Sequence, residues 1–160
     1  MSLCALANFL ALEPQYQTLC ADLHRKEANA RVLVSNSSLA FTLAGLAQSL
    51  DMPILVITDR PDNALGIYNQ VGMWSKTDSL VMHFPENESL PFERLASDVD
   101  TVHQRLEVLS ALSKVGVSQP LVISSITAIL QKTIAKDSLT SIQHTLHHGD
   151  KIKLQEVLSR

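Results

Sequence analysis

The sequence is poor in cysteine, glycine, proline and aromatic residues. Its 160 residues include 2 Cys, 5 Gly and 6 Pro, and 4% are aromatic. Two cysteines without a CxxC pair cannot supply a tetrahedral zinc site by themselves, so we expect Cys4 and Cys20 to be reduced thiols of a cytoplasmic protein. The low glycine and proline content excludes collagen-like and low-complexity chains. The scarcity of aromatic rings argues against a stacking platform for single-stranded nucleic acid.

The chain also lacks a charge excess and a long apolar run. It has 13 Lys and Arg against 16 Asp and Glu, a formal net charge of −3, so the basic excess typical of nucleic-acid-binding modules is missing. No apolar stretch approaches the roughly 20 residues that span a bilayer. The apolar N-terminal stretch has no basic residue before it and ends at Glu13-Pro14, so we expect a short helix there and not a signal peptide. These features predict a cytoplasmic globular protein without a membrane partner.

Short aliphatic runs alternate with segments of helical periodicity. The strand candidates are Arg31–Val34, Ile54–Ile57, Leu80–Phe84 and Pro120–Ser124. Such runs without alternation are typical of strands buried on both faces of a parallel sheet. Apolar spacings of three and four residues predict helices over 16–28, 39–50 and 98–114, with shorter helical segments around 64–72 and 125–131. This order predicts an α/β fold, a parallel sheet with helices on its faces.

The character of the sequence changes after Gln131, where a polar and weakly periodic stretch begins. We therefore expect three parts: an N-terminal helical segment over 1–30, an α/β domain over 31–131 and the start of a second subdomain over 132–160. The last part contains an amphipathic pattern at Leu154, Val157 and Leu158 with nothing obvious to pack against. On this interpretation the chain is a truncated piece of a longer protein.

In an α/β fold of this order, a phosphate-binding loop would lie in the segment after the first strand candidate, residues 35–41. A P-loop needs glycines and a lysine, and a dinucleotide loop needs Gly-x-Gly-x-x-Gly. The segment has neither glycine nor lysine, and its key positions are Asn36, Ser38, Leu39 and Ala40. We expect a helix start capped by Ser37 or Ser38, without a bound cofactor.

Three other features of the sequence contain residue types used in catalysis or metal binding, but each lacks the partners or the spacing that such chemistry needs. Six acidic and two basic residues lie between Glu86 and Glu107, but no histidine or hydroxyl pattern converges on them, so we expect a solvated or partner-contacting loop. No Cys or Glu with zinc-binding spacing accompanies the histidines near the C-terminus, so we expect no metal there. Ser37, Ser38 and Ser124 have no G-x-S-x-G context, so we expect no hydrolase nucleophile among them. The histidine-rich cluster comprises His144, His147, His148 and Asp150.

An alternative stays open at this point. Open parallel sheets bind ligands at the carboxyl ends of their strands. Ser35, Thr58 and Ser124 follow or end three of the predicted strands. The chain could therefore be a small α/β enzyme or a nucleotide- or sugar-phosphate-binding domain that uses this edge.

The acidic segment resembles a known family. FPENESLPFE at 84–93, then Asp100 and RLEVL at 105–109, are similar to the N-terminal module of bacterial transcription-repair coupling factors (Mfd). Phe92 stands where that family usually has Tyr, and Ala96-Ser97 stands near its common Ser-Pro. The positions that carry the resemblance are Glu88, Leu90, Pro91, Phe92, Asp100 and Arg105.

The resemblance implies a fold. The module of that family is similar to the first domain of the excision-repair protein UvrB, which is P-loop-NTPase or RecA-like. Laid against the Walker A loop of UvrB, Asn36 and Ser38 fall on glycines, Leu39 on the lysine and Ala40 on the threonine. The resemblance thus implies a degenerate copy that does not hydrolyse ATP.

The resemblance also implies a role, recruitment of the nucleotide excision repair protein UvrA to stalled RNA polymerase. In that family, RNA polymerase and DNA are engaged by other domains, including an ATP-dependent translocase. The UvrA-contacting motif lies in the second subdomain and ends in Asp-x-Phe-Pro. Residues 1–160 do not contain that motif, so no functional residue is carried over, and we expect no catalytic residue in this part.

Overall fold

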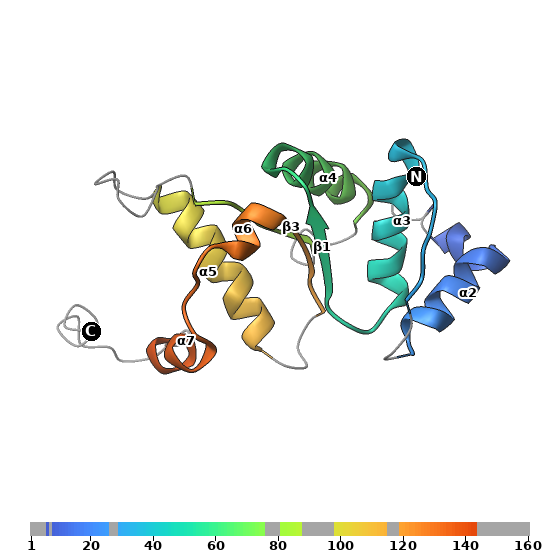
Figure 1. The fold of residues 1–160 in the computed structure, drawn as a ribbon. Helices are drawn as coiled ribbons and strands as arrows, with labels where there is room; N and C mark the ends of the chain where they lie inside the picture. The colour runs from blue at the N-terminus through green and yellow to red at the C-terminus, as the bar shows by residue number, and fades with distance from the viewer. Residues whose placement is uncertain are drawn as a thin grey trace, which may run out of the picture.

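The structure is a computed structural model, and it describes residue 6 and residues 8–25, 29–75, 81–87, 98–114 and 119–143. Three short strands and a set of helices alternate along the described chain (Figure 1). The elements are η1 (Asn8–Leu12), α2 (Pro14–Leu23), α3 (Asn36–Ser49), β1 (Ile54–Thr58), α4 (Pro61–Trp74), β2 (Val81–Phe84), α5 (Val99–Ser113), β3 (Leu121–Ser125), α6 (Ile126–Leu130) and α7 (Lys136–Ile142).

The strands form one parallel sheet in the order β1-β3-β2, so the last strand in sequence lies at the centre. Leu121 of β3 is level with Ile54 of β1 on one side and with Val81 of β2 on the other. All five residues of β3 are buried, as expected for a central strand covered on both faces. The predicted α/β class, with a parallel sheet flanked by helices, is confirmed for the described residues.

The strand expected at Arg31–Val34 is not formed, and this prediction is wrong. The four residues have no regular secondary structure, and Leu33 is 100% exposed. A short aliphatic run forms a strand only where neighbouring strands and helices bury it. No described element does so here, and the described sheet therefore has three strands in place of four.

One face of the sheet packs against α3 and α4. Successive residues of a strand point to opposite faces, and Leu121, Ile123 and Val81 point to this side. They form a core cluster with small residues of the two helices, notably Ala44 and Ala64. The small side chains let the helices lie close to the sheet and to each other.

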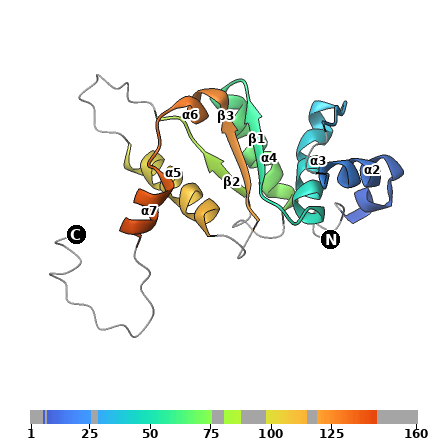
Figure 2. The same ribbon diagram turned by 60° about the horizontal axis from the view of Figure 1, so that its bottom comes forward.

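The opposite face packs against α5 and α6, but the two helices cover it only in part (Figure 2). Val122 and Phe84 are buried there with Val108 of α5. On the same face of the sheet, the β1 side chains of Leu55 and Ile57 are 55% and 51% exposed. The helical cover thus ends at β3, and β1 is bare on this side.

Two helical pieces extend the fold beyond the sheet. Segments η1 and α2 pack against α3, where the Tyr16 hydroxyl donates a hydrogen bond of 3.0 Å to Ser49. Burial of this ring raises the pKa of Tyr16 to about 12, against the opposing effect of the Ser49 hydrogen bond. At the other end α7 contacts α5 and buries Leu139. Among the described residues no helix combines the length and apolarity needed to cross a membrane.

Candidate functional site

The position expected to hold a degenerate phosphate loop is the start of α3. The N-cap is Ser35 and not Ser37 or Ser38, so the predicted cap is corrected by two to three residues. The Ser35 hydroxyl lies 3.0 Å from that of Ser37 and 2.7 Å from that of Ser38. It makes no side-chain cap to the helix backbone, because the three hydroxyls are engaged with one another.

The residues that follow give this helix start an apolar interior. Asn36 is exposed, and Ser38 and Leu39 are half-buried. Ala40 is 2% exposed and packs in the core beside Ala44. These four positions, which the resemblance places on the Walker A glycines, lysine and threonine, therefore present neither a cation nor a free hydroxyl pair to an anion.

At the carboxyl edge of the sheet the candidate hydroxyls are engaged by the backbone. Ser124 is fully buried and donates to the carbonyl of Phe84 at 2.9 Å. Thr58 donates to the carbonyl of Arg60 at 2.8 Å. The Ser124 hydroxyl thus joins β3 to the end of β2, the Thr58 hydroxyl holds the turn after β1, and Ser35 is the N-cap of α3.

Arg105 is the buried cation of this edge, and its role was not predicted. It is 8% exposed and its guanidinium lies 4.1 Å from the centre of the Phe84 ring. Its Nη1 donates to the carbonyl of Pro85 at 2.7 Å and reaches the Ala128 carbonyl at 3.4 Å. Desolvation by burial lowers the pKa of the guanidinium below its ordinary value, but an arginine remains charged at neutral pH.

Gln131 completes a network around the segment that leaves β2. Its Oε1 accepts from Arg105 Nη1 at 3.3 Å and from the backbone N–H of Asn87 at 2.8 Å. Its Nε2 donates to the Asn87 carbonyl at 3.0 Å. One residue earlier, the Glu86 carboxylate accepts from the Thr127 hydroxyl at 2.7 Å. This network, which we call the Arg105 hub, fixes the first residues of the acidic segment against α6.

The far end of the acidic segment is also fixed. Asp98 is the N-cap of α5 and accepts from Thr101 through its backbone N–H at 3.3 Å and its hydroxyl at 3.2 Å. Asp100 is exposed in the first turn of α5. The remaining motif positions Glu88, Leu90, Pro91 and Phe92 lie outside the described residues, so of the motif the structure places Asp100 and Arg105.

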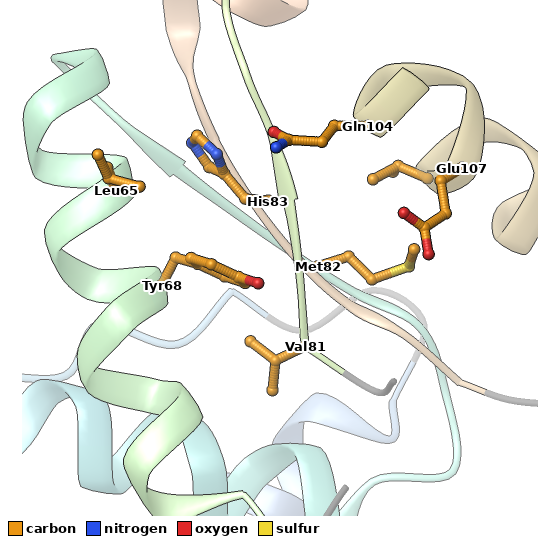
Figure 3. A pocket seen from close by; sticks show the side chains of 8 residues that line it. Leu65, Tyr68, Val81, Met82, His83, Gln104 and Glu107 are labelled. Atoms are coloured by element: carbon orange, nitrogen blue, oxygen red, sulfur yellow. The ribbon is translucent and has the colours of Figure 1, made fainter. Parts of the chain in front are cut away.

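A cavity of about 350 Å³ lies beside β2, between α4 and α5 (Figure 3). On the α4 side the rings of His83 and Tyr68 are stacked with centroids 5.5 Å apart. On the α5 side Gln104 and Glu107 line the cavity. Burial lowers the pKa of His83, which favours the neutral imidazole at neutral pH. The sequence predicts that Tyr68 lies in a helix and His83 in a strand, but nothing in their spacing shows that the two rings meet.

A larger cavity of about 610 Å³ lies at the end of β1, between α3 and α4. Its apolar wall includes Leu39 and Ile67, and its polar wall includes Thr58, Asp59 and Asp62. Asp59 accepts a 2.6 Å hydrogen bond from Asn63, and this bond lowers the pKa of the exposed Asp59 carboxyl. Two carboxylates and no lining cation make this cavity unfavourable for a phosphate group.

Within the described ranges no three His, Cys, Asp or Glu side chains are grouped as metal ligands would be. The cluster His144, His147, His148 and Asp150 lies outside these ranges, as does Cys4. Cys20 is a half-buried free thiol.

In comparisons with known proteins, no family profile matches the chain, and no curated protein is significantly similar to it.

Proposed function

We propose that this chain is a non-catalytic, UvrB-like module of a transcription-repair coupling factor, with a P-loop-NTPase or RecA-like ancestry. Its role is to help recruit UvrA and the nucleotide excision repair machinery to stalled RNA polymerase. Polymerase and DNA are contacted by other domains of such a protein.

The observation that carries the proposal is the Arg105 hub. The family motif joins an acidic segment to an arginine that follows about fifteen residues later. Here that arginine is buried and bonded to the carbonyl of Pro85, where the acidic segment begins. Because the arginine holds the start of the acidic segment in place, the two parts of the motif depend on each other. This dependence gives a physical reason for them to occur together.

The start of α3 supports the non-catalytic part of the proposal. A working Walker A loop wraps phosphates with glycine N–H groups and a lysine. Here the hydroxyls of Ser35, Ser37 and Ser38 bond to one another, and Leu39 and Ala40 take the positions of the lysine and threonine. Leu39 forms part of the apolar wall of the cavity at the end of β1, and Ala40 lies in the core.

The first test is titration of the chain with Mg-ATP by calorimetry. We expect no heat of binding at micromolar nucleotide. The double substitution Leu39→Lys with Ala40→Thr is the matched variant, and we expect it not to restore binding because the glycines are still missing. Micromolar affinity of the unsubstituted chain would overturn the non-catalytic assignment.

The second test addresses recruitment. The UvrA-contacting motif of the family is not found in residues 1–160, so we expect weak or no capture of UvrA by these residues alone. A coupling factor whose corresponding N-terminal segment is replaced by residues 1–160 should retain UvrA capture in a pull-down. If the chimera folds but no longer captures UvrA, the proposed kinship is wrong. If residues 1–160 capture UvrA tightly by themselves, the contact surface lies within them.

The alternative is a small-molecule-binding α/β domain or enzyme that uses the carboxyl edge of the sheet. The observation in its favour is the cavity of about 610 Å³ at the end of β1, which includes Thr58. A thermal-shift screen with nucleotides, nucleosides and sugar phosphates separates the two proposals. A specific ligand whose effect is lost in Asp59→Asn would favour the alternative.

A further inference from the structure

The cavity beside β2 runs along the outer edge of the described sheet, and we call it the edge groove. It is lined by Leu65 and Tyr68 of α4, by three consecutive residues of β2 and by Gln104, Glu107 and Val108 of α5. The three β2 residues are Val81, Met82 and His83. Figure 3 shows β2 passing between the two helices, with His83 and Tyr68 on one side and Gln104 and Glu107 on the other.

This lining places the groove on the strand's edge and not on either face. Consecutive residues of a strand point to opposite faces of the sheet. A site that touches Val81, Met82 and His83 together, and helices from both faces, must lie at the strand's open side. In the described sheet β2 pairs with β3 alone, so its outer backbone N–H and C=O groups border this groove.

The two walls of the groove differ in character. The α4 wall is apolar and aromatic, with Leu65 and the ring of Tyr68 stacked on His83. The α5 wall carries two polar side chains, the amide of Gln104 and the carboxylate of Glu107, beside the apolar Val108. Glu107 is exposed and forms no ion pair with any described residue. A bound peptide would therefore meet apolar surface on one side and, on the other, a carboxylate that no described residue pairs with.

We propose that the edge groove binds an extended peptide segment of a partner protein, added alongside β2, in which apolar and basic residues alternate. The main chain of the segment bonds to the outer edge of β2, as in other complexes formed by strand addition. Because side chains alternate along a strand, every second residue faces Tyr68 and the residues between face Glu107. The apolar residues pack on the α4 wall and a Lys or Arg pairs with Glu107. This inference rests on the geometry of β2 and is independent of the proposed function.

The shape of the groove favours a single segment over a second copy of this chain. The edge of β2 is flanked by α4 and α5, which both line the cavity. A second copy that paired its own β2 here would bring its own two flanking helices against them. One extended strand needs only about 4.8 Å of width beside β2. A cavity of about 350 Å³ has room for a few residues of such a strand.

The test uses the full chain and a library of blocked hexapeptides whose four central positions vary. We expect the selected peptides to alternate apolar with Lys or Arg. The best of them should lose about tenfold in affinity, roughly 1.4 kcal/mol, when Glu107→Lys is introduced. Asp51→Lys, an exposed site outside the groove, makes the same charge change and should bind as the unsubstituted chain does.

Two further measurements separate strand addition from adsorption to an apolar surface. A peptide methylated on the central backbone nitrogens should bind at least tenfold more weakly, because it cannot donate to β2. Hydrogen exchange of the 81–84 amides should slow on peptide binding while exchange in β1 stays unchanged.

Each other outcome counts against the proposal. Selected peptides without the alternation, or binding that Glu107→Lys and Asp51→Lys weaken equally, would overturn the assigned chemistry. Indifference to N-methylation would overturn strand addition. A library with no binder at millimolar peptide would overturn the site. If the chain instead forms a dimer that protects the same β2 amides, a second copy occupies the groove.

Discussion

Arg105 and Gln131 meet with Nη1 and Oε1 3.3 Å apart, and each side chain also holds a backbone carbonyl of the segment that leaves β2. The carbonyls are those of Pro85 and Asn87. The end of a strand, the middle of α5 and the residue after α6 are thereby tied together in one polar cluster. Such a cluster is sensitive to the loss of any member, because the remaining partly buried polar groups each lose a hydrogen bond.

Arg105→Met keeps most of the apolar stem and removes every donor. We expect the free energy of unfolding to fall by about 2–4 kcal/mol in urea denaturation, since the Pro85 carbonyl loses its buried partner. Arg25, whose side chain is 76% exposed in a surface pair with Asp22, is the matched control, and Arg25→Met should cost less than about 1 kcal/mol. Equal losses in the two variants would contradict the anchoring role. A double-mutant cycle with Gln131→Ala should give a coupling energy of about 0.5–2 kcal/mol.

Gly45 and Gly66 lie in helices but in different surroundings. A Cβ at Gly45 would lie 2.6 Å from Leu10 Cδ1 and 3.1 Å from the Tyr16 hydroxyl, whereas one at Gly66 would meet nothing within 4 Å. We expect Gly66→Ala to stabilise the fold by about 0.5–1 kcal/mol through helix propensity. Gly45→Ala should be less stable than Gly66→Ala by about 1 kcal/mol, because the ends of the Leu10 and Tyr16 side chains must move to admit the Cβ. Thermal unfolding of both variants checks the prediction, and equal stabilisation by the two substitutions would refute the packing of η1 and α2 on α3.

His83 should make stability depend on pH. Burial lowers its pKa in the folded chain below the ordinary 6.5, so the folded state binds fewer protons than the unfolded state. Its contribution is therefore fully present above about pH 6.5 and is lost as the pH falls below that value. As the pH is lowered from about 7.5 to about 5.5, the free energy of unfolding should fall less in His83→Phe than in the unsubstituted chain. The phenylalanine keeps a ring against Tyr68. Tyr68 and Glu107 are the other titratable groups that line the cavity.

Urea midpoints at the two pH values give the comparison for His83→Phe. His103→Gln, which removes an exposed imidazole from α5, is the control and should follow the unsubstituted chain. Parallel pH dependence of all three proteins would show that His83 does not contribute.

Ser124→Ala should report on the carboxyl edge of the sheet. The hydroxyl is fully buried and satisfies the carbonyl of Phe84, so its removal should lower the free energy of unfolding by about 1–2 kcal/mol. Ser37→Ala, at an exposed position, should change it by less than about 0.5 kcal/mol. If Ser124→Ala has the same free energy of unfolding as the unsubstituted chain, the hydrogen bond from Ser124 of β3 to Phe84 of β2 does not contribute to stability.

Local sequence patterns were sufficient to predict most of the described strands and helices. The aliphatic runs that contain Ile54, Val81 and Leu121 do form the three described strands, and α5 begins after Asp98 and ends beside Lys114 as its periodicity predicts. The run at Arg31–Val34 is also mainly aliphatic, but no described segment buries it, and it is not a strand. Burial by distant segments decides such cases, and it cannot be obtained from four residues of sequence.

In the candidate site, too, local sequence predicts some features, and contacts between distant segments decide the others. The apolar character of Leu39 and Ala40 is visible in the sequence and agrees with their packing. The role of Arg105 is not visible, because its partners Pro85, Ala128 and Gln131 are distant in sequence and meet it only in the folded chain. The stack of Tyr68 on His83 likewise depends on how α4 crosses the sheet.

The position of β3 at the centre of the sheet constrains how the chain can fold during synthesis. In the described sheet β1 and β2 are made first but do not pair with each other, and each pairs with β3. Until Leu121–Ser125 has left the ribosome, neither earlier strand has the partner that it pairs with in the described sheet, and Ile54 cannot pair with Leu121. The sheet is therefore assembled late and through non-local contacts, which slow folding. A nascent chain stopped before β3 should expose the aliphatic β1 segment to chaperones and to aggregation.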